Sequence, residues 1–246
     1  MREPRLKSLS GRELRKVIVL YRILCLVIGY ICGLMETGVI YGKIIGVDIR
    51  NYGSKNLGMT NALRVLGPKA GLVVFVGDFC KSFVPCLVTR LIFINAFPNT
   101  FLIYVLYTGF GAVLGHVFPF YLRFKGGKGV ATIAGMIVGL LSEWMILILL
   151  VLFVSTVAIS RYLSLGSICL MIEFAVIYVI FAFAGLLCFD KADPVSFRTM
   201  LESFVIVFIF SGLSVYRHKE NIKRLMNHAE NRFSFKKSVD IKIEEK

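Results

Sequence analysis

The sequence is short of charged residues, of histidine and of paired cysteine motifs. Only 18% of its 246 residues are Asp, Glu, Lys or Arg, and three are histidine. Its six cysteines form no C-x-x-C pair, and none has a histidine at the spacing of a zinc site. The P-loop pattern G-x-x-x-x-G-K followed by Ser or Thr is also missing. We therefore predict no metal site and no other cofactor.

Apolar residues, by contrast, make up 57% of the chain and come in long blocks. A helix needs about 20 mostly apolar residues to cross a hydrocarbon core of roughly 30 Å, and a spanning segment must satisfy its own backbone hydrogen bonds. We predict an all-α, polytopic membrane protein with about seven transmembrane helices, forming a single domain over residues 1–246. The predicted spans are 23–41, 72–93, 101–114, 130–142, 145–159, 165–188 and 199–216.

The charges between these spans predict the topology. The formal net charge is +14, and basic loops usually stay on the cytoplasmic side. Basic residues therefore place 42–69, 119–129 and the tail 217–246 in the cytoplasm, with the N-terminus outside. The basic N-terminal extension, residues 1–16, argues for the opposite orientation of the first span. No nucleic-acid motif accompanies the charge, so we expect membrane lipid or an anionic substrate as partner, and no nucleic acid.

Polar residues gather in three segments on the predicted cytoplasmic face. The first, 48–67, has glycines that let the backbone turn, and such turns can direct N–H groups at an anion. Thr60 and Arg64 lie one helical turn apart and can share a ligand. An ordinary loop capped by Thr60 or Asn61 is an equally good explanation. The candidate binding residues are Ser54, Asn56, Thr60, Asn61 and Arg64.

The second segment, 115–135, contains the sequence KGGKG between two apolar runs. Lys125 and Lys128 flank Gly126 and Gly127, just before an expected helix. Phosphate binds well to backbone N–H groups at a helix N-terminus together with a lysine. His116 lies upstream and is either a proton carrier or a polar residue that anchors a helix end. The pattern suggests an anion site without specifying a reaction.

The third segment is 216–233, where His218 and Asn221 share one helix face because they are three residues apart. A histidine can exchange a proton near neutral pH, and an amide can orient it or a substrate. A basic helix that only contacts lipid head groups is the alternative. Within the spans, Asp78 and Lys81 form a structural or catalytic charge pair, and Glu36 has no evident partner in the sequence.

Together the three segments resemble the bacterial acyl-phosphate-dependent glycerol-3-phosphate acyltransferases of the PlsY type. That family has the motifs G-S-G-N-x-G-A-T-N-x-x-R, G-H-x-F-P…F-K-G-G-K-G-V-A-T and H-x-x-N-I-x-R-L-x-x-G-x-E. The matching sequences are GSKNLGMTNALR (53–64), GHVFPFYLRFKGGKGVAT (115–132) and HKENIKRLMNHAE (218–230). Their order and spacing agree from about residue 20 to 233.

The sequence departs from the family pattern at several positions. Lys55 and His228 stand where the family has glycine, Met59 where it has alanine, and Ser82 where a glycine usually follows the Asp–Lys pair. The first span lacks the family's Ser-x-Pro and has Glu36 near that point. These departures leave open a divergent paralogue with low activity or an altered substrate.

The resemblance implies a seven-span enzyme in the bacterial inner (plasma) membrane, multi-pass, with its active face in the cytoplasm. It implies transfer of a fatty acyl group from acyl phosphate to glycerol 3-phosphate. The products would be 1-acylglycerol 3-phosphate (lysophosphatidic acid), for phospholipid biosynthesis, and phosphate. Acyl phosphate already has a good leaving group, so orientation and charge stabilisation can supply most of the catalysis without a metal or an acyl-enzyme.

By the same resemblance, the catalytic residues are Ser54, Lys128, His218 and Asn221. A transporter of a phosphorylated solute is the alternative from another class, although no duplicated half is evident. An acyl-CoA-dependent enzyme is disfavoured because no histidine has an aspartate five residues further on. The implied substrate-binding residues are Asn56, Thr60, Asn61, Arg64, His116, Lys125, Gly126, Gly127 and Ser160, with Ser164 or Ser167 as alternatives to Ser160.

Overall fold

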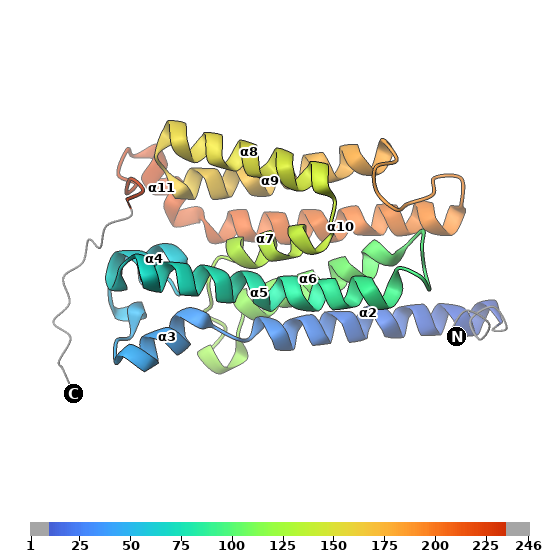
Figure 1. Ribbon diagram of the computed structural model, residues 1–246, viewed down its shortest axis with the longest axis horizontal. Coiled ribbons are helices and arrows are strands. Elements are labelled where there is room, and N and C mark those ends of the chain that lie inside the picture. The colour runs from blue at the N-terminus through green and yellow to red at the C-terminus, as the bar shows by residue number, and fades with distance from the viewer. Residues whose placement is uncertain (1–9, 235–246) are drawn as a thin grey trace.

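The long apolar blocks form a bundle of helices that run side by side (Figure 1). The computed structural model describes residues 10–234, and this part of the chain contains no β-strand, so the all-α prediction is confirmed. The elements are α2 (Gly11–Gly33), α3 (Thr37–Ile45), η1 (Ile49–Asn51), α4 (Met59–Leu66), α5 (Pro68–Phe93), α6 (Phe101–Val117), η2 (Phe120–Leu122), α7 (Val130–Gly139), α8 (Glu143–Ser160), α9 (Leu163–Phe183), α10 (Pro194–Arg217) and α11 (Lys219–Met226).

Six candidate spans are long and apolar enough to cross a membrane within the described residues. They are α2 with α3, α5, α6, α8, α9 and α10. The predicted span 130–142 differs, because α7 has only 10 residues and is therefore about 15 Å long, half of a hydrocarbon core. Residues 125–129, directly before it, have no regular secondary structure. The seven predicted spans thus become six full-length candidates and one short helix.

Helices α2 and α6 approach each other closely because glycines face the neighbouring backbone. A Cβ atom on Gly29 would lie 1.9 Å from the Thr108 carbonyl oxygen, and one on Gly111 would lie 2.1 Å from the Leu26 carbonyl oxygen. Small residues permit such contact between membrane helices. Helix α6 is the most buried of the candidate spans. Its last turn, with His116, is therefore held firmly beside the KGGKG segment.

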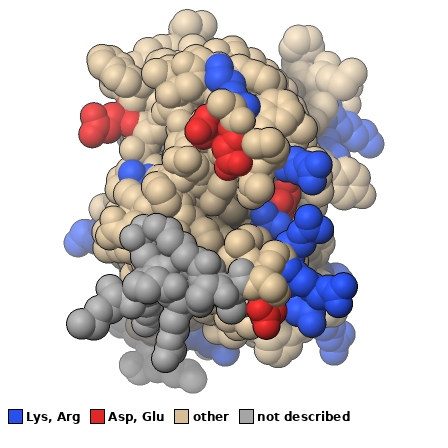
Figure 2. Space-filling model, turned by 90° about the vertical axis from the view of Figure 1, so that its right-hand side faces the viewer, with Lys and Arg blue, Asp and Glu red and all other residues tan. Residues whose placement is uncertain are grey.

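Both basic terminal segments contain helix within the described residues, in α2 and in α11. Residues 11–16 are the first turns of α2, which starts from a capping box between Ser10 and Glu13. Helix α2 begins at the end of the bundle opposite to α4 and α11, as the predicted topology requires (Figure 1). Figure 2 views that opposite end, where acidic and basic residues lie among each other. Residues 1–9 and 235–246 lie outside the described residues.

Candidate active site

The three polar segments meet at one pocket, at the end of the bundle where α4 and α11 lie (Figure 1). Its wall combines the loop before α4, the start of α7, the start of α9, the α10–α11 junction and residues 230–234. The sequence therefore predicted correctly that these distant segments come together. The predicted residues that line the pocket are Ser54, Asn56, Thr60, Asn61, Arg64, His116, Lys128, His218 and Asn221.

Asn61 shapes the first wall of the pocket. Its Oδ1 accepts a hydrogen bond from the Ser54 N–H at 2.8 Å, and its Nδ2 donates to the carbonyls of Ile49 and Tyr52 at 2.9 and 3.2 Å. Both amide hydrogens are thus used within the protein, and the residue is buried. Asn61 therefore holds the loop that carries Ser54, and its predicted contact with substrate stays a prediction.

Thr60 and Arg64 both line the pocket from α4, as their spacing predicted. The Arg64 side chain is partly buried, and this burial lowers the pKa of its guanidinium. The Glu230 carboxylate opposes that effect and Arg224 adds to it. Arginine nevertheless keeps its charge in proteins, so α4 supplies a permanent cation to the pocket.

The backbone of the KGGKG segment has a different role from the one predicted. The Gly126 N–H donates to the Val117 carbonyl and the Gly127 N–H donates to the His116 carbonyl, both at 3.1 Å. Neither glycine lines the pocket, and Lys125 is exposed outside it. The prediction that these two N–H groups bind a phosphate is wrong for this conformation, because both already have partners. The segment instead lies against the end of α6.

Lys128 is the residue of this segment that enters the pocket wall. Its carbonyl accepts a hydrogen bond from the Ser214 hydroxyl at 3.0 Å, and its Nζ donates to Asn221 Oδ1. Burial lowers the pKa of Lys128 to about 8, with Arg224 adding to the effect and Glu230 opposing it. Lys128 is therefore a cation whose charge depends on pH within the physiological range.

His218 lies at the junction of α10 and α11 and lines the pocket. Its Nδ1 is 2.8 Å from the Ser214 carbonyl oxygen. Since a carbonyl can only accept, Nδ1 carries the proton and Nε2 keeps its lone pair in the neutral ring. Burial and then the nearby Lys128 lower the pKa of His218 to about 4. The ring is accordingly uncharged at neutral pH and offers Nε2 as an acceptor.

Two charged residues that line the pocket, Arg224 and Glu230, were not among the site residues predicted from the sequence. Glu230 Oε1 accepts from Asn221 Nδ2 at 3.2 Å, and Glu230 Oε2 pairs with Arg224 Nε at 2.8 Å. Nearby, the Phe233 N–H donates to the Arg161 carbonyl at 2.7 Å, so this part of the tail covers the pocket. Glu230 is the last residue of the third motif, which was the available signal for it.

The structure also distinguishes the three candidate serines around the junction of α8 and α9. Ser160 Oγ donates to the Thr156 carbonyl at 2.6 Å and accepts from the Tyr162 N–H at 3.1 Å, and it does not line the pocket. Ser164 and Ser167 do line it. Ser164 Oγ is buried and has no hydrogen-bond partner within residues 10–234. Ser164 therefore replaces Ser160 as the serine available to a ligand.

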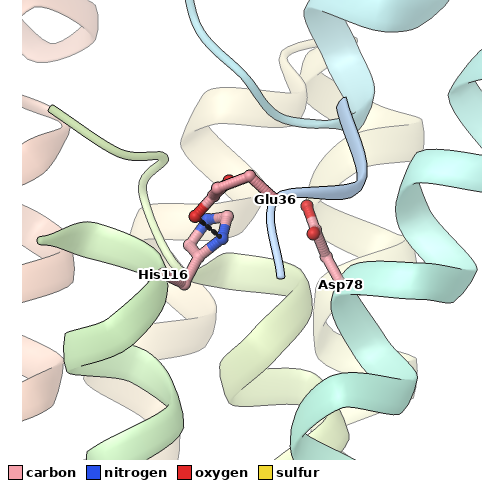
Figure 3. Close-up of side chains that lie close together, drawn as sticks. All are labelled: Glu36, Asp78 and His116. Carbon is pink, nitrogen blue, oxygen red and sulfur yellow. Dashed lines mark ion pairs between the residues drawn. The ribbon is translucent and has the colours of Figure 1, made fainter. Parts of the chain in front are cut away.

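A buried group of side chains next to the pocket has the composition of a metal site, and two of them, Asp78 and His116, also line the pocket. Ligand atoms of Glu36, Asp78 and His116 all lie within 4.8 Å of one another (Figure 3). The Lys81 Nζ, however, lies 3.0 Å from Asp78 Oδ1 and 2.7 Å from His116 Nδ1. The Lys81 ammonium thus already supplies these ligand atoms with the positive charge that a metal ion would bring.

Comparison with known proteins identifies the family. The sequence profile described as "Glycerol-3-phosphate acyltransferase" matches residues 23–228. The chain belongs to the glycerol-3-phosphate acyltransferase family. Relatives of that name from Chlorobaculum tepidum and Chlorobium phaeobacteroides are each 40% identical, over 226 and 225 residues. Both alignments cover 85% of this chain and 95% of the relative.

Solved structures of this acyltransferase family agree with the fold. The crystal structure of PlsY (YgiH), an integral membrane glycerol 3-phosphate acyltransferase, has a TM-score of 0.70 in its glycerol 3-phosphate form. It is 34% identical, and the alignment covers 87% of this chain and 96% of that one. The lysophosphatidic acid form gives 0.68 at 33% identity. Membership of the glycerol-3-phosphate acyltransferase family favours the predicted enzyme over the transporter alternative.

Proposed function

We propose that this chain transfers a fatty acyl group from acyl phosphate to the 1-hydroxyl of glycerol 3-phosphate. The observation that carries the proposal is the pocket itself, at one end of a membrane bundle, which is lined by three cations and two carboxylates together with neutral hydrogen-bonding groups. The cations are Arg64, Lys128 and Arg224, and the carboxylates are Asp78 and Glu230. Both substrates are anions, and such a wall can bind their phosphates. Family membership and the glycerol 3-phosphate form of the similar PlsY structure support the acceptor. The PlsY-type motifs support the donor.

The reaction requires one bond to form and one to break at the acyl carbonyl carbon. The hydroxyl oxygen of glycerol 3-phosphate attacks this carbon, and the bond from the carbon to the phosphate oxygen breaks. Phosphate leaves with the bonding electrons. Lys128 and Arg64 are placed to stabilise the charge on the departing group, and Ser54 and Ser164 can donate hydrogen bonds to phosphate oxygens.

The hydroxyl proton must also be transferred, and His218 or a phosphate can accept it. The pKa of His218 is lowered to about 4, whereas a phosphate monoester has a second pKa of about 6. A substrate phosphate, to which this monoester value applies, is therefore a stronger base than His218. We assign His218 to orientation of the hydroxyl, which donates to Nε2, and Asn221 to fixing the Lys128 ammonium.

The apolar part of the pocket fits the acyl chain of the donor. Apolar side chains from α4, α5, α7, α8, α9 and the segment after α11 line the pocket together with the polar ones. We place the pocket on the cytoplasmic side of the bacterial inner membrane, in agreement with the basic segments around it. The apolar residues are Met59, Leu63, Phe75, Val130, Ala131, Phe153, Leu163 and Phe233.

A comparison of acyl donors tests the proposal. The purified protein is given labelled glycerol 3-phosphate with either palmitoyl phosphate or palmitoyl-CoA. We expect lysophosphatidic acid from palmitoyl phosphate, with one phosphate released for each product molecule. Equal or faster reaction with palmitoyl-CoA would show that the proposed donor is wrong. No acylated glycerol 3-phosphate from either donor would show that the proposed function as a whole is wrong.

A further inference from the structure

A cluster of four buried charged or titratable side chains adjoins the pocket, and two of them, Asp78 and His116, line it. Glu36 comes from the break between α2 and α3, Asp78 and Lys81 from α5, and His116 from the last turn of α6. Their exposed fractions are 0%, 2%, 5% and 3%, respectively. Buried charges in membrane helices are costly and are usually functional. The cluster joins three separate elements at the level of the pocket.

Lys81 lies among the other three groups. Its Nζ is 3.0 Å from Asp78 Oδ1, 2.7 Å from His116 Nδ1 and 3.8 Å from Glu36 Oε1, and it also donates to the Met35 carbonyl at 2.8 Å. A divalent cation held by the same ligand atoms would have to share this space with the ammonium. The cluster is therefore better explained as a support for a neighbouring group than as a metal site.

Glu36 has few polar contacts of its own. Its Oε1 is 3.1 Å from His116 Nδ1 (Figure 3). Neither carboxylate oxygen has a hydrogen-bond partner within the described residues, and Oε1 lies 3.8 Å from the Lys81 ammonium, which provides an ionic contact. A fully buried carboxylate in this position attracts the Lys81 ammonium, which in turn contacts His116 Nδ1 at 2.7 Å. Glu36 and Lys81 thus both lie against Nδ1 of the His116 ring.

The opposite side of the His116 ring touches the KGGKG segment. A Cβ atom on Gly127 would lie 2.1 Å from His116 Nε2, so the ring packs directly on this glycine. The His116 carbonyl also accepts the Gly127 N–H at 3.1 Å. Gly127 immediately precedes Lys128, whose side chain enters the pocket. The position of the ring therefore fixes the backbone that carries Lys128.

We propose that Glu36 is a positioning residue for the substrate phosphate site, acting on Lys128 through the His116 ring and Gly127. Glu36 itself does not line the pocket. The inference rests on the proposed role of Lys128 in binding phosphate, and it assigns a role to the carboxylate at a point where the sequence departs from the family pattern. Loss of the polar group at position 36 allows the His116 ring to move, and this movement displaces the Lys128 ammonium from its place in the pocket.

Kinetics of Glu36 variants test the role in positioning. Glu36→Leu removes the polar contact at similar volume, and we expect KM for glycerol 3-phosphate to rise roughly fivefold or more, with a smaller change in kcat. Glu36→Gln keeps a polar oxygen of the same length near Nδ1, and its KM is expected to lie closer to wild type. The matched control is Glu173→Leu, which replaces a partly buried carboxylate of α9 outside the pocket. An unchanged KM in Glu36→Leu, or the same changes in Glu173→Leu, would overturn the proposal.

Amine labelling of Lys128 gives a second measurement that does not need catalysis. Glycerol 3-phosphate is expected to protect Lys128 of the wild type and of Glu173→Leu at the same concentrations, and to protect Lys128 of Glu36→Leu only at concentrations roughly fivefold or more higher. Equal protection in all three proteins would remove the role of Glu36 and leave the proposed function intact. If even the wild type is not protected, the proposed function of Lys128 fails, and the inference fails with it.

Discussion

At the scale of single residues, two lysines of the KGGKG segment show how much position matters. Lys125 and Lys128 are three residues apart, yet Lys125 is exposed outside the pocket and Lys128 lines it. Burial lowers the pKa of Lys128 to about 8. At this pKa the charge of Lys128 depends on pH, whereas the charges of Arg64 and Arg224 in the same pocket wall are permanent.

The first prediction concerns the pH dependence of the reaction. An ammonium group binds phosphate only while it is protonated, so kcat/KM for glycerol 3-phosphate should fall as pH rises through about 8, the pKa of Lys128 in the free protein. Steady-state rates between pH values of about 6 and 10 measure this descending limb. A profile that stays flat to the upper end of this range would contradict the role of Lys128.

Two departures from the family motifs share a backbone feature. Lys55 and His228 occupy positions where the resemblance expects glycine, and their φ angles are 59° and 53°. This left-handed region favours glycine, because a Cβ atom comes close to the following carbonyl oxygen there. Neither side chain lines the pocket. The substitutions therefore affect the backbone more directly than the binding site.

Replacement of Lys55 by glycine tests this explanation. Lys55→Gly should raise the free energy of unfolding by about 1 kcal/mol, because it relieves the left-handed conformation. Activity should stay within about twofold, as for other surface substitutions. The control Lys43→Gly lies inside α3 and should lower stability by about 1 kcal/mol. Thermal unfolding in detergent measures both changes, and a loss of stability in Lys55→Gly would contradict the explanation.

At the scale of elements, the segment after α11 closes the pocket and brings one carboxylate into it. Glu230 is buried and contacts Arg224 and Asn221. Its charge also raises the pKa of Lys128 against the effect of burial. The tail, which was predicted to be basic, thus contributes the Glu230 carboxylate to the site, and the negative charge of this carboxylate balances the surrounding cations.

Neutralising this carboxylate should move the pH profile in a definite direction. Glu230→Gln removes a charge that raises the pKa of Lys128, so the descending limb of kcat/KM should shift to lower pH. Glu220→Gln, an exposed position on α11, serves as the control and should leave the limb in place. A shift of the limb to higher pH in Glu230→Gln would contradict this electrostatic account.

The elements differ in how well the sequence predicted them. The apolar blocks of the sequence predicted the positions of five spans closely, namely α5, α6, α8, α9 and α10. Lipid imposes a simple length requirement on the helices that cross it, and this requirement can be read from the sequence. The short helix α7 was predicted to be longer, because residues 130–142 are mostly apolar. The irregular segment 125–129 before it is held by hydrogen bonds to the end of α6, and these contacts form only in the folded chain. The break between α2 and α3, which places Glu36 beside Lys81, depends in the same way on tertiary contacts.

At the scale of the whole molecule, the convergence of three distant polar segments was predictable because the charges place them on one face. Individual roles inside the pocket were less predictable. Asn61 and the amides of Gly126 and Gly127 resemble ligand-binding groups in sequence, but they are used up by internal hydrogen bonds. Ser164 and Ser160 differ only in their local partners. Hydrogen-bond partners of this kind appear only when the chain is folded.

The orientation of the bundle in the membrane is itself a prediction. Lys191 precedes α10 at the end opposite to the pocket, and Lys219 begins α11 at the pocket end. In a cysteine-free background, Lys191→Cys should react with a membrane-impermeant thiol reagent added to intact cells, and Lys219→Cys should react only after the cells are opened. The reverse pattern would place the pocket outside the cell and contradict the proposed topology.

The central claim is that Lys128 in this pocket drives acyl transfer from acyl phosphate to glycerol 3-phosphate. The most direct measurement is kcat/KM for lysophosphatidic acid formation by the wild type, Lys128→Ala and Lys125→Ala. Loss of one charge-stabilising group should lower the value for Lys128→Ala by about 100-fold or more. Lys125→Ala, with its exposed side chain, should stay within about twofold of the wild type. Full activity in Lys128→Ala, or an equal loss in Lys125→Ala, would contradict the account.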